Sequence, residues 1–453
     1  MGSLAGLLHD AGYEVRGSDN AVYPPMSTML HERGIPILQG YEARHLDDRP
    51  DLVVVGNVAT RHNPEAVAAQ ERGIPFLSMP QAIGRLFLEG RHPIVIAGTH
   101  GKTTTAALMS WVLSSAGRRP SFLVGGVLRN FDRSYGLGEG AEFVIEGDEY
   151  ETAFFDKGPK FLHYRPRTAI LTSVEFDHAE MFPSLDAVKD AFRRFVALVP
   201  REGLLVACSD DPNVRELLAR AAVPLVTYGL GADCAWRGRV VETDPEGMDI
   251  EITTGDSLFG RFRTRLSGLQ NLMNILAIAA VASARGLDAA AIGEGLRTFA
   301  GVRRRQEVRG VACGVTVIDD FAHHPTAVGL TLDGLRRRYA GRRLWAVFEP
   351  RTNTSRRSVF QEDYARSFGA ADRVLIAAVD HPERAPEGAR FSVERLVEDL
   401  RARGQEARYV PTVAAIVELL AREAEAGDVV VIMSNGAFGG IHQKLLQALE
   451  RSP

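Results

Sequence analysis

The chain has 453 residues, 45% of them hydrophobic and 24% charged, with a formal net charge of −4. This length exceeds what one hydrophobic core usually holds, so two to four domains are expected. The acidic balance argues against a nucleic-acid-binding protein, which carries a basic surplus or a basic face. No apolar run reaches the roughly 20 residues that span a bilayer, and three distant cysteines indicate a reducing compartment. We therefore expect a soluble, cytoplasmic protein with neither nucleic acid nor a membrane as a partner.

The N-terminal residues predict a helix over 3–12 and a strand over 13–17, with Ser18 and Asp19 directly after the strand. A dinucleotide-binding type of domain begins with a strand and a glycine-rich turn before such a helix. We therefore expect a Rossmann-like domain over residues 1–90 whose first strand is missing.

Beyond this segment, short β-rich runs alternate with helical patterns. Continuous apolar runs between helices are typical of parallel sheets that are buried on both faces. The predicted fold class is therefore α/β, with a central P-loop ATPase-like domain over residues 91–300 and a Rossmann-like domain over residues 301–453. Between 240 and 265 the pattern alternates and turns break it, which predicts a small antiparallel excursion. The apolar runs are 51–56, 93–98, 142–146, 168–172, 344–348 and 428–433.

The run at 93–98 leads into a glycine loop and then into a helical pattern. In such loops the glycines turn backbone N–H groups toward phosphate oxygens, and the helix N-terminus adds positive potential. Lys102 is expected to reach the β- and γ-phosphates, and the Thr103 hydroxyl to hold Mg²⁺. Ile96 stands where the usual spacing has glycine, yet the strand–loop–helix context predicts ATP binding rather than a plain turn. The loop consists of Gly98, Thr99, His100, Gly101, Lys102, Thr103 and Thr104.

Two further runs end in acidic clusters, at 146–149 and at 175–178. Carboxylates at a strand end can hold Mg²⁺ directly or through water. A single acid there is more often a solvated charge or a helix cap, but two clusters after a phosphate loop favour a metal site. We take Thr103, Glu146 and His178 as the metal candidates, although histidine is an unusual ligand for Mg²⁺.

Polar residues at later strand and helix ends give weaker signals. Asn271 and Asn274 share one helix face and suit the edge of an adenine ring, but helix capping by Asn271 explains the local pattern equally well. His323 and His324 are adjacent and so point in different directions, which favours hydrogen bonds to phosphate or ribose over shared metal ligation. Arg351 follows a strand and suits an anionic group. Each of these signals alone is by default a structural turn.

Together these motifs resemble the Mur ligase family over nearly the whole chain. The shared segments are 98–104, 301–305 and 320–326. Four more segments are similar to the branch of the family that acts in peptidoglycan recycling, namely 23–28, 56–64, 146–157 and 433–438. Two positions depart from the family's usual pattern, because Gln270 replaces a histidine beside the adenine and Ser173 replaces an asparagine.

The resemblance implies an ATP-dependent ligase that joins the murein tripeptide L-alanyl-γ-D-glutamyl-meso-diaminopimelate to UDP-N-acetylmuramate through an acyl phosphate. Lys102, Glu146 and His178 would be its catalytic residues, with ATP and Mg²⁺ as cofactors. Besides the glycine loop, the implied ATP contacts are Asn271, Asn274, Arg304, Asp320 and Arg351. The implied substrate contacts are Ser18, Asp19, Arg61 and Asn63 for the UDP-sugar, and His324, Asn435 and Phe438 in the C-terminal domain, where Arg351 is also a candidate for the peptide.

Three alternatives stand beside this interpretation. The first is the family's UDP-N-acetylmuramate–L-alanine ligase, whose residues differ in the four segments. The second is folylpolyglutamate synthase, which lacks a first domain like the one around residues 23–63. The third, from another class, is a nucleotide-binding protein without ligase activity. The missing first strand supports this last alternative, because in the family that strand and its glycine turn cradle part of the UDP.

Overall fold

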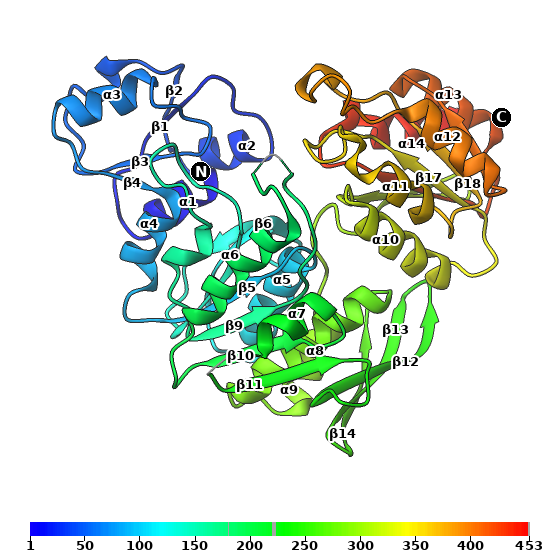
Figure 1. Ribbon diagram of the computed structural model, residues 1–453, viewed down its shortest axis with the longest axis horizontal. Helices are drawn as coiled ribbons and strands as arrows, with labels where there is room; N and C mark the ends of the chain where they lie inside the picture. The colour runs from blue at the N-terminus through cyan, green and yellow to red at the C-terminus, as the bar shows by residue number, and fades with distance from the viewer. Residues whose placement is uncertain (180, 220–222, 452–453) are drawn as a thin grey trace. The chain divides into compact units, whose positions relative to one another are not determined.

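The computed structural model in Figure 1 describes residues 1–179, 181–219 and 223–451, which divide into two compact units. The predicted N-terminal domain and most of the predicted central domain share the first unit. The predicted domain boundaries at residues 90 and 300 stay predictions. The first unit comprises Met1–Glu175, Asp186–Arg237 and Leu276–Gly295, and the second comprises Phe176–Leu185, Gly238–Ile275 and Leu296–Pro453.

The N-terminal part of the first unit contains two separate pairs of short parallel strands. No strand among the described residues joins the two pairs. The predicted first helix is confirmed as α1 (Gly2–Asp10), but the strand predicted over 13–17 is wrong. Pairing starts only at Gly17, because its partner strand begins at Ile37. The pairs are β1 (Gly17–Asp19) with β2 (Ile37–Gln39) and β3 (Val53–Val55) with β4 (Phe76–Ser78), and the helices are α2 (Met26–Glu32), α3 (Pro64–Glu71) and α4 (Met79–Ile83).

The rest of the first unit is built on a sheet with the strand order β11-β10-β9-β5-β8-β6-β7. β7 is antiparallel to β6 and the other neighbours are parallel, as the continuous apolar runs predict. β5 (His92–Ala97) lies in the interior of the sheet, and its Ile94, Val95 and Ile96 are fully buried. The other strands are β6 (Ser121–Leu128), β7 (Arg133–Gly136), β8 (Glu142–Gly147), β9 (Thr168–Leu171), β10 (Leu204–Cys208) and β11 (Leu225–Gly229). The helices wholly or partly in this unit are α5 (Lys102–Ser115), α6 (Leu185–Ala197), α7 (Pro212–Leu218), α8 (Leu269–Ala284) and α9 (Ala289–Thr298).

The register of this sheet brings three loops to one edge. Ala97, the last residue of β5, pairs with Gly147 of β8 and with Leu171 of β9. Because the three strands are parallel, the glycine loop, the acids that follow β8 and residues 172–175 all leave the sheet at its carboxyl edge. Ligands bind at this edge in parallel α/β sheets.

The second unit contains the predicted antiparallel excursion, which is confirmed. β13 (Gly247–Thr254) pairs antiparallel with β14 (Ser257–Thr264), and β12 (Trp236–Asp244) leads into them.

The larger part of the second unit is a sheet with the order β15-β16-β20-β17-β18-β19, parallel except between β15 and β16. Successive residues of β20 point to opposite faces. Val429 and Val431 pack in one core cluster with α10, α11 and α12, and Val430 and Ile432 pack in another with α13 and α14. The sheet is therefore covered on both faces, as predicted. No helix among the described residues is long and apolar enough to cross a membrane. The strands are β15 (Glu307–Ala312), β16 (Val315–Asp320), β17 (Leu344–Phe348), β18 (Arg373–Ile376), β19 (Glu406–Tyr409) and β20 (Val429–Met433), and the helices are α10 (Pro325–Arg338), α11 (Gln361–Ser367), α12 (Val393–Ala402), α13 (Val413–Glu423) and α14 (Ile441–Arg451).

Candidate active site

The glycine loop after β5 adopts a backbone that suits glycine at two positions. Gly98 has φ 134°, and a side-chain carbon there would overlap Thr172 Oγ1. Gly101 has φ 81° and is the residue directly before α5. A larger residue at either position would be strained. The first N–H groups of a helix lack partners inside the helix, so the N-terminus of α5 beyond this loop is suited to bind an anion.

Residues that follow β9 brace the glycine loop. The Thr99 N–H donates to the Ser173 carbonyl at 2.9 Å, and the His100 N–H donates to Ser173 Oγ at 3.1 Å. Thr172 Oγ1 donates to the His100 carbonyl at 2.6 Å. From the sequence, Ser173 was noted only as a departure from the family pattern. The contact of Ser173 with the glycine loop was not predicted. Its position directly after an apolar run was the signal that could have shown it.

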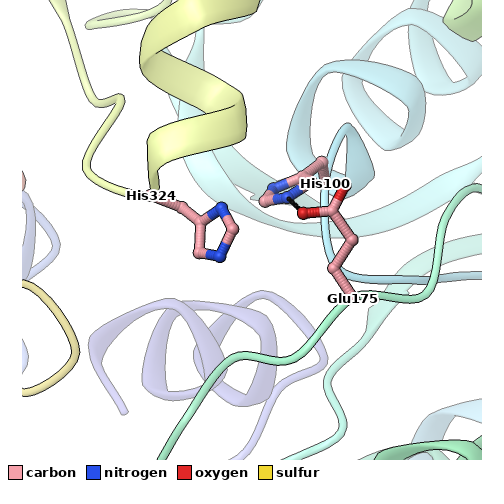
Figure 2. A group of neighbouring side chains, drawn as sticks. All are labelled: His100, Glu175 and His324. Atoms are coloured by element: carbon pink, nitrogen blue, oxygen red, sulfur yellow. Dashed lines mark hydrogen bonds and ion pairs between the residues drawn. The ribbon is translucent and has the colours of Figure 1, made fainter. Parts of the chain in front are cut away.

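Figure 2 shows how His100 and Glu175 face each other in the first unit. His100 Nε2 lies 3.3 Å from Glu175 Oε2. The Glu175 N–H donates to Thr99 Oγ1 at 2.9 Å, so this segment holds the loop by both backbone and side chain. His324, also drawn, belongs to the second unit, whose own contacts fix it.

Lys102 is buried at the start of α5 with its ammonium already engaged. Lys102 Nζ donates to the carbonyls of Gly98 and Thr99 at 2.5 and 3.4 Å, and lies 3.0 Å from Glu149 Oε2. Burial alone would lower the pKa of Lys102, but the charges of Glu149, Asp148 and Glu146 outweigh it and raise the pKa. Lys102 is therefore a fixed positive charge in the loop, as its predicted role with phosphates requires.

Two of the predicted metal candidates lie side by side. Thr103 Oγ1 donates to Glu146 Oε2 at 3.0 Å, and the other oxygen of Glu146 accepts from the Gly125 N–H. Burial, and then the charge of Asp148, raise the pKa of Glu146. A hydroxyl and a carboxylate at a strand end are oxygen ligands of the kind that Mg²⁺ prefers. A cation there would also offset the cost of a buried carboxylate, so the residues fit the predicted ion.

The three acids at the carboxyl end of β8 have separate partners. Glu146 contacts Thr103, Glu149 contacts Lys102, and Asp148 Oδ2 pairs with Lys160 Nζ at 3.0 Å. Burial alone would raise the pKa of Asp148, but Lys160 and Lys102 lower it. The sequence grouped these acids as one cluster and selected Glu146. The pairing of Glu149 with the loop lysine was missed, because spacing does not say which acid faces which lysine.

His178, the third metal candidate, belongs to the second unit, so its place beside Thr103 and Glu146 stays a prediction. It has φ 52°, and its N–H donates to Asp177 Oδ1 at 2.7 Å. Thr354 Oγ1 donates to the same oxygen at 2.9 Å. Burial alone would raise the pKa of Asp177, but the neighbouring histidines, with His178 foremost, hold it well below its ordinary value. Asp177 is thus a carboxylate that orders the backbone at His178.

Asn271 and Asn274 lie together in the first turns of α8. Asn274 Nδ2 donates to Asn271 Oδ1 at 3.2 Å, and Asn271 Nδ2 donates to the Ser267 carbonyl at 2.8 Å. Helix capping by Asn271 is wrong, because the helix starts at Leu269 and the Asn271 amide donates to a carbonyl instead of accepting a helix N–H. The shared face is confirmed, and the contact with adenine stays a prediction.

Asp320 ends β16 in a cradle of backbone donors. It accepts from the N–H groups of Gln306 and Ala322, both at 2.8 Å. Burial raises its pKa despite these donors and the nearby charge of Arg305. The side chain is 97% buried in this state, and its predicted contact with ATP stays a prediction.

The adjacent histidines before α10 have different partners, as predicted. His324 is the residue before the helix, and its Nδ1 accepts from the Thr326 N–H at 3.3 Å. His323 Nδ1 lies 3.1 Å from the Phe321 carbonyl. Contacts of His324 with a substrate stay a prediction.

Arg304 holds the loop after β20, which we call the 434–436 loop. Its guanidinium donates to the carbonyls of Ser434 and Gly436 at 2.6 and 2.7 Å, and its Cζ lies 5.2 Å from the centre of the Phe321 ring. This bidentate contact fixes the loop backbone. The sequence predicted that Arg304 contacts ATP. That contact stays a prediction, and the structure shows Arg304 bound to the loop carbonyls instead.

The same loop adjoins Arg351. A side-chain carbon on Gly436 would lie 2.5 Å from Arg351 Nε, so the glycine makes room for the guanidinium. Arg351 lies 3.9 Å from Glu349 and 3.7 Å from Asp380. Asn435 Oδ1 is buried and has no hydrogen-bond partner among the described residues. A buried oxygen without a donor is costly, which makes Asn435 a good candidate to accept from a ligand.

Phe438 closes this loop on its inner side. It is 3% exposed and packs in the core cluster of α13 and α14. The structure therefore gives Phe438 a packing role, and its predicted contact with the peptide stays a prediction.

The four predicted UDP contacts lie in the N-terminal part of the first unit. Ser18 Oγ donates to Glu65 Oε2 at 2.5 Å, and Asn63 caps α3 by accepting from the Glu65 N–H at 2.9 Å. Asp19 ends β1, and Arg61 is exposed. Ser18 and Asn63 thus meet at Glu65, and UDP binding by the four residues stays a prediction.

Three family models match the chain in sequence order. They are "Mur ligase family, catalytic domain" over residues 1–91, "Mur ligase middle domain" over residues 96–282, and "Mur ligase, glutamate ligase domain" over residues 303–436. Together they span most of the chain and agree with the predicted three-part α/β architecture.

Individual relatives match over their full length. UDP-N-acetylmuramate--L-alanyl-gamma-D-glutamyl-meso-2,6-diaminoheptandioate ligase of Escherichia coli (strain K12) is 42% identical, with 100% of this chain and 96% of that protein covered. UDP-N-acetylmuramate--L-alanine ligase of Rubrobacter xylanophilus is 34% identical, with 99% and 97% covered.

Solved structures agree with this result. A murein peptide ligase from Psychrobacter arcticus matches with a TM-score of 0.73 at 36% identity, with 100% of this chain and 96% of that chain covered. UDP-N-acetylmuramate-alanine ligase from Thermotoga maritima matches with a TM-score of 0.81 at 22% identity, with 100% and 97% covered, and shows the shared fold. The resemblance found in the sequence is confirmed: the chain belongs to the Mur ligase family.

Proposed function

We propose that the chain is an ATP-dependent ligase that joins L-alanyl-γ-D-glutamyl-meso-diaminopimelate to UDP-N-acetylmuramate. The observation that carries this proposal is the 42% identity, over 100% of this chain and 96% of the relative, to a protein named for that reaction. The relatives named as L-alanine ligases are 30–34% identical. The L-alanine ligase is therefore the second candidate, and it differs from the first only in the amine substrate.

The chemistry follows from the difficulty of joining a carboxylate to an amine. The lactyl carboxylate of UDP-N-acetylmuramate attacks the γ-phosphate of ATP, which gives an acyl phosphate and ADP. The free amine of the L-alanyl residue then attacks the acyl carbon, the carbon–oxygen bond to phosphate breaks, and an amide, inorganic phosphate and a proton are released. Phosphorylation supplies the leaving group that a bare carboxylate lacks, and the protein contributes positioning and charge neutralisation.

The residues of the first unit have the chemistry for the phosphoryl step. Lys102 would neutralise charge on the transferred phosphoryl group. Thr103 and Glu146, with His178, would hold Mg²⁺, which when bound neutralises the phosphate oxygens. The glycine loop would cradle the phosphates through backbone N–H groups.

The remaining contacts are assigned as the family resemblance implies. Ser18, Asp19, Arg61 and Asn63 would bind the UDP-sugar. Asn271, Asn274, Arg304, Asp320 and Arg351 would bind ATP, with the two asparagines at the adenine. His324, Asn435 and Phe438 would bind substrate at the C-terminal domain, where Arg351 is also a candidate, with domain limits near residues 90 and 300.

Phosphate release from ATP, with each substrate omitted in turn, tests the proposal. We expect release only when UDP-N-acetylmuramate and the tripeptide are both present. Release with UDP-N-acetylmuramate and free L-alanine in place of the tripeptide would favour the second candidate. Release that is indifferent to both substrates would overturn ligation altogether.

A further inference from the structure

The proposed chemistry gives no role to Asp148 or Glu149, the two acids directly after β8, and Glu149 is the one that pairs with Lys102. Its side chain is 3% exposed, and it faces the ammonium of Lys102, whose side chain is 12% exposed. Glu146 is engaged with Thr103 and Asp148 with Lys160, so these acids have other partners. A buried carboxylate is expensive unless it is paired, and here the pair falls on the lysine that contacts phosphate in the proposed function.

The ammonium of Lys102 has three hydrogens, and three groups receive them. Two are neutral backbone carbonyls of the glycine loop, those of Gly98 and Thr99, and the third is the Glu149 carboxylate. Hydrogen bonds between two charged groups are stronger than those to neutral carbonyls. An incoming triphosphate therefore displaces the carbonyls more readily than the carboxylate, and the ammonium keeps one fixed anchor while it contacts phosphate.

We propose that Glu149 is a positioning residue that anchors the Lys102 ammonium while the phosphates of ATP replace the Gly98 and Thr99 carbonyls. The inference rests on the use of ATP in the proposed function. It does not depend on which carboxylate or which amine the protein joins.

The Glu149–Lys102 pair should affect nucleotide binding and turnover in opposite directions. The charge of Glu149 lies near the phosphates and repels them, so it weakens nucleotide binding. The anchor holds Lys102 where it neutralises the transferred group, so it raises the rate, because a catalytic group displaced by about 1 Å can lose about 100-fold in rate. A residue that served only to stabilise the fold would not separate the two effects.

Two substitutions separate charge from position. Glu149→Gln keeps the length and an acceptor oxygen but removes the charge. Glu149→Asp keeps the charge but is one methylene too short to stay 3.0 Å from Lys102 Nζ. The matched control is Glu151→Gln, because Glu151 lies two residues away in a solvent-exposed pair with Lys157 and is outside the site.

The test measures the Kd of the non-hydrolysable ATP analogue AMPPNP with Mg²⁺, the kcat of ligation and the melting temperature for each variant. We expect Glu149→Gln to bind AMPPNP about fivefold more tightly and to lose about 100-fold in kcat. Glu149→Asp should bind like the unaltered protein but lose a similar factor in kcat, and Glu151→Gln should match the unaltered protein in both.

The inference is overturned if Glu149→Gln binds AMPPNP more weakly and melts lower, which is the signature of a structural role, or if kcat is unchanged in both Glu149 variants. The AMPPNP measurement uses the protein without UDP-sugar or peptide. If the unaltered protein binds AMPPNP but does not ligate the tripeptide, the proposed substrates are wrong. The difference in AMPPNP Kd between Glu149→Gln and Glu149→Asp still decides the role of Glu149.

Discussion

The glycine loop of the first unit and the 434–436 loop of the second are both held in place by their own unit, but by different means. Around the glycine loop, charged side chains face one another, as Lys102 faces Glu149. Around the 434–436 loop, Arg304 grips backbone carbonyls, and the Asn435 oxygen is left without a partner among the described residues. The first arrangement places charged groups that can turn toward phosphate. The second fixes a backbone shape and leaves a buried, uncharged acceptor without a donor among the described residues.

Substitutions at the two loops should therefore affect different steps. Changes at the glycine loop should alter the rate of phosphoryl transfer, because that step moves charge. Changes at the 434–436 loop should alter binding of the tripeptide. A shifted loop misplaces the hydrogen-bond acceptors of the loop without changing the charge at the γ-phosphate. Measurements of kcat and KM for variants at each loop distinguish these two effects.

Removal of the loop lysine should have the largest effect. Lys102→Ala is expected to lower kcat by about 1,000-fold, since it removes the only lysine in the phosphate loop and charge stabilisation of this kind is worth a factor of that size. Steady-state phosphate release measures it. Lys157→Ala, at an exposed lysine, is the control and should retain full activity. A fall of less than tenfold in Lys102→Ala would contradict the role given to the lysine.

Loss of the Glu146 carboxylate should act through the metal. Glu146→Gln keeps the hydrogen bond from Thr103 but lowers the charge of the ligand, and we expect the Mg²⁺ concentration for half-maximal activity to rise by about 10- to 100-fold. A titration of activity with Mg²⁺, after removal of bound metal by a chelator, measures this shift. An unchanged Mg²⁺ requirement would remove Glu146 from the metal site.

Substitution of Arg304, which holds the 434–436 loop, should affect binding of the tripeptide more than the rate. Arg304→Lys keeps the charge but loses the planar guanidinium that lies over the Phe321 ring and sets Nη2 against both carbonyls. We expect the KM for the tripeptide to rise about tenfold with a smaller change in kcat. Arg309→Lys, at an exposed arginine paired with Glu307, is the matched control. A rise in the KM for ATP alone would instead support the contact with ATP that the sequence predicts for Arg304.

Substitution of Gly436, in the same loop, should raise the KM for the tripeptide by a smaller factor. Gly436→Ala places a carbon 2.5 Å from Arg351 Nε, so the guanidinium must move aside. We expect the tripeptide KM to rise about threefold, with little change in melting temperature because the arginine side chain is flexible. Equal rises in the KM of all three substrates would show that the loop is not specific to the peptide.

Substitution of His92, at the start of β5 and away from the glycine loop, should affect stability and leave turnover unchanged. Burial, and then Arg285, lower the pKa of His92 from 6.5 to about 4, so the folded chain holds this imidazole neutral. Between pH 6.5 and 4 the unfolded chain takes up a proton that the folded chain does not, so the free energy of unfolding falls as the pH falls through this window. His92→Gln should lose part of that dependence in urea unfolding at pH 7 and pH 5, with unchanged kcat at pH 7. An identical pH dependence in both proteins would contradict the assigned shift.

The sequence predicted the features that depend on local pattern. The continuous apolar run before Gly98 identified a buried parallel strand, and the glycines at 98 and 101 identified the loop, because both signals reside in neighbouring residues. The antiparallel excursion near β13 was predicted from alternation for the same reason. The strand over 13–17 failed because a strand also needs a partner, and β2 offers one only from Gly17 onward.

The contacts that escaped prediction join residues far apart in the chain. Glu149 and Lys102 are 47 residues apart, and Arg304 and Ser434 are 130 apart. Which side chains meet across such distances depends on strand order and register, which a single sequence does not display. For the same reason Phe438, selected as a substrate contact, is packed in a core, since a loop motif does not say which of its side chains face inward.

The transfer of a labelled oxygen from the carboxylate to phosphate distinguishes ligation through an acyl phosphate from simple ATP hydrolysis. UDP-N-acetylmuramate with ¹⁸O in both oxygens of its lactyl carboxylate is incubated with the protein, ATP, Mg²⁺ and the tripeptide, and the inorganic phosphate is analysed by mass spectrometry. Ligation through an acyl phosphate predicts one ¹⁸O in each phosphate and the other in the new amide of a UDP-N-acetylmuramoyl tripeptide. Phosphate without ¹⁸O, released while no such amide forms, would contradict the account.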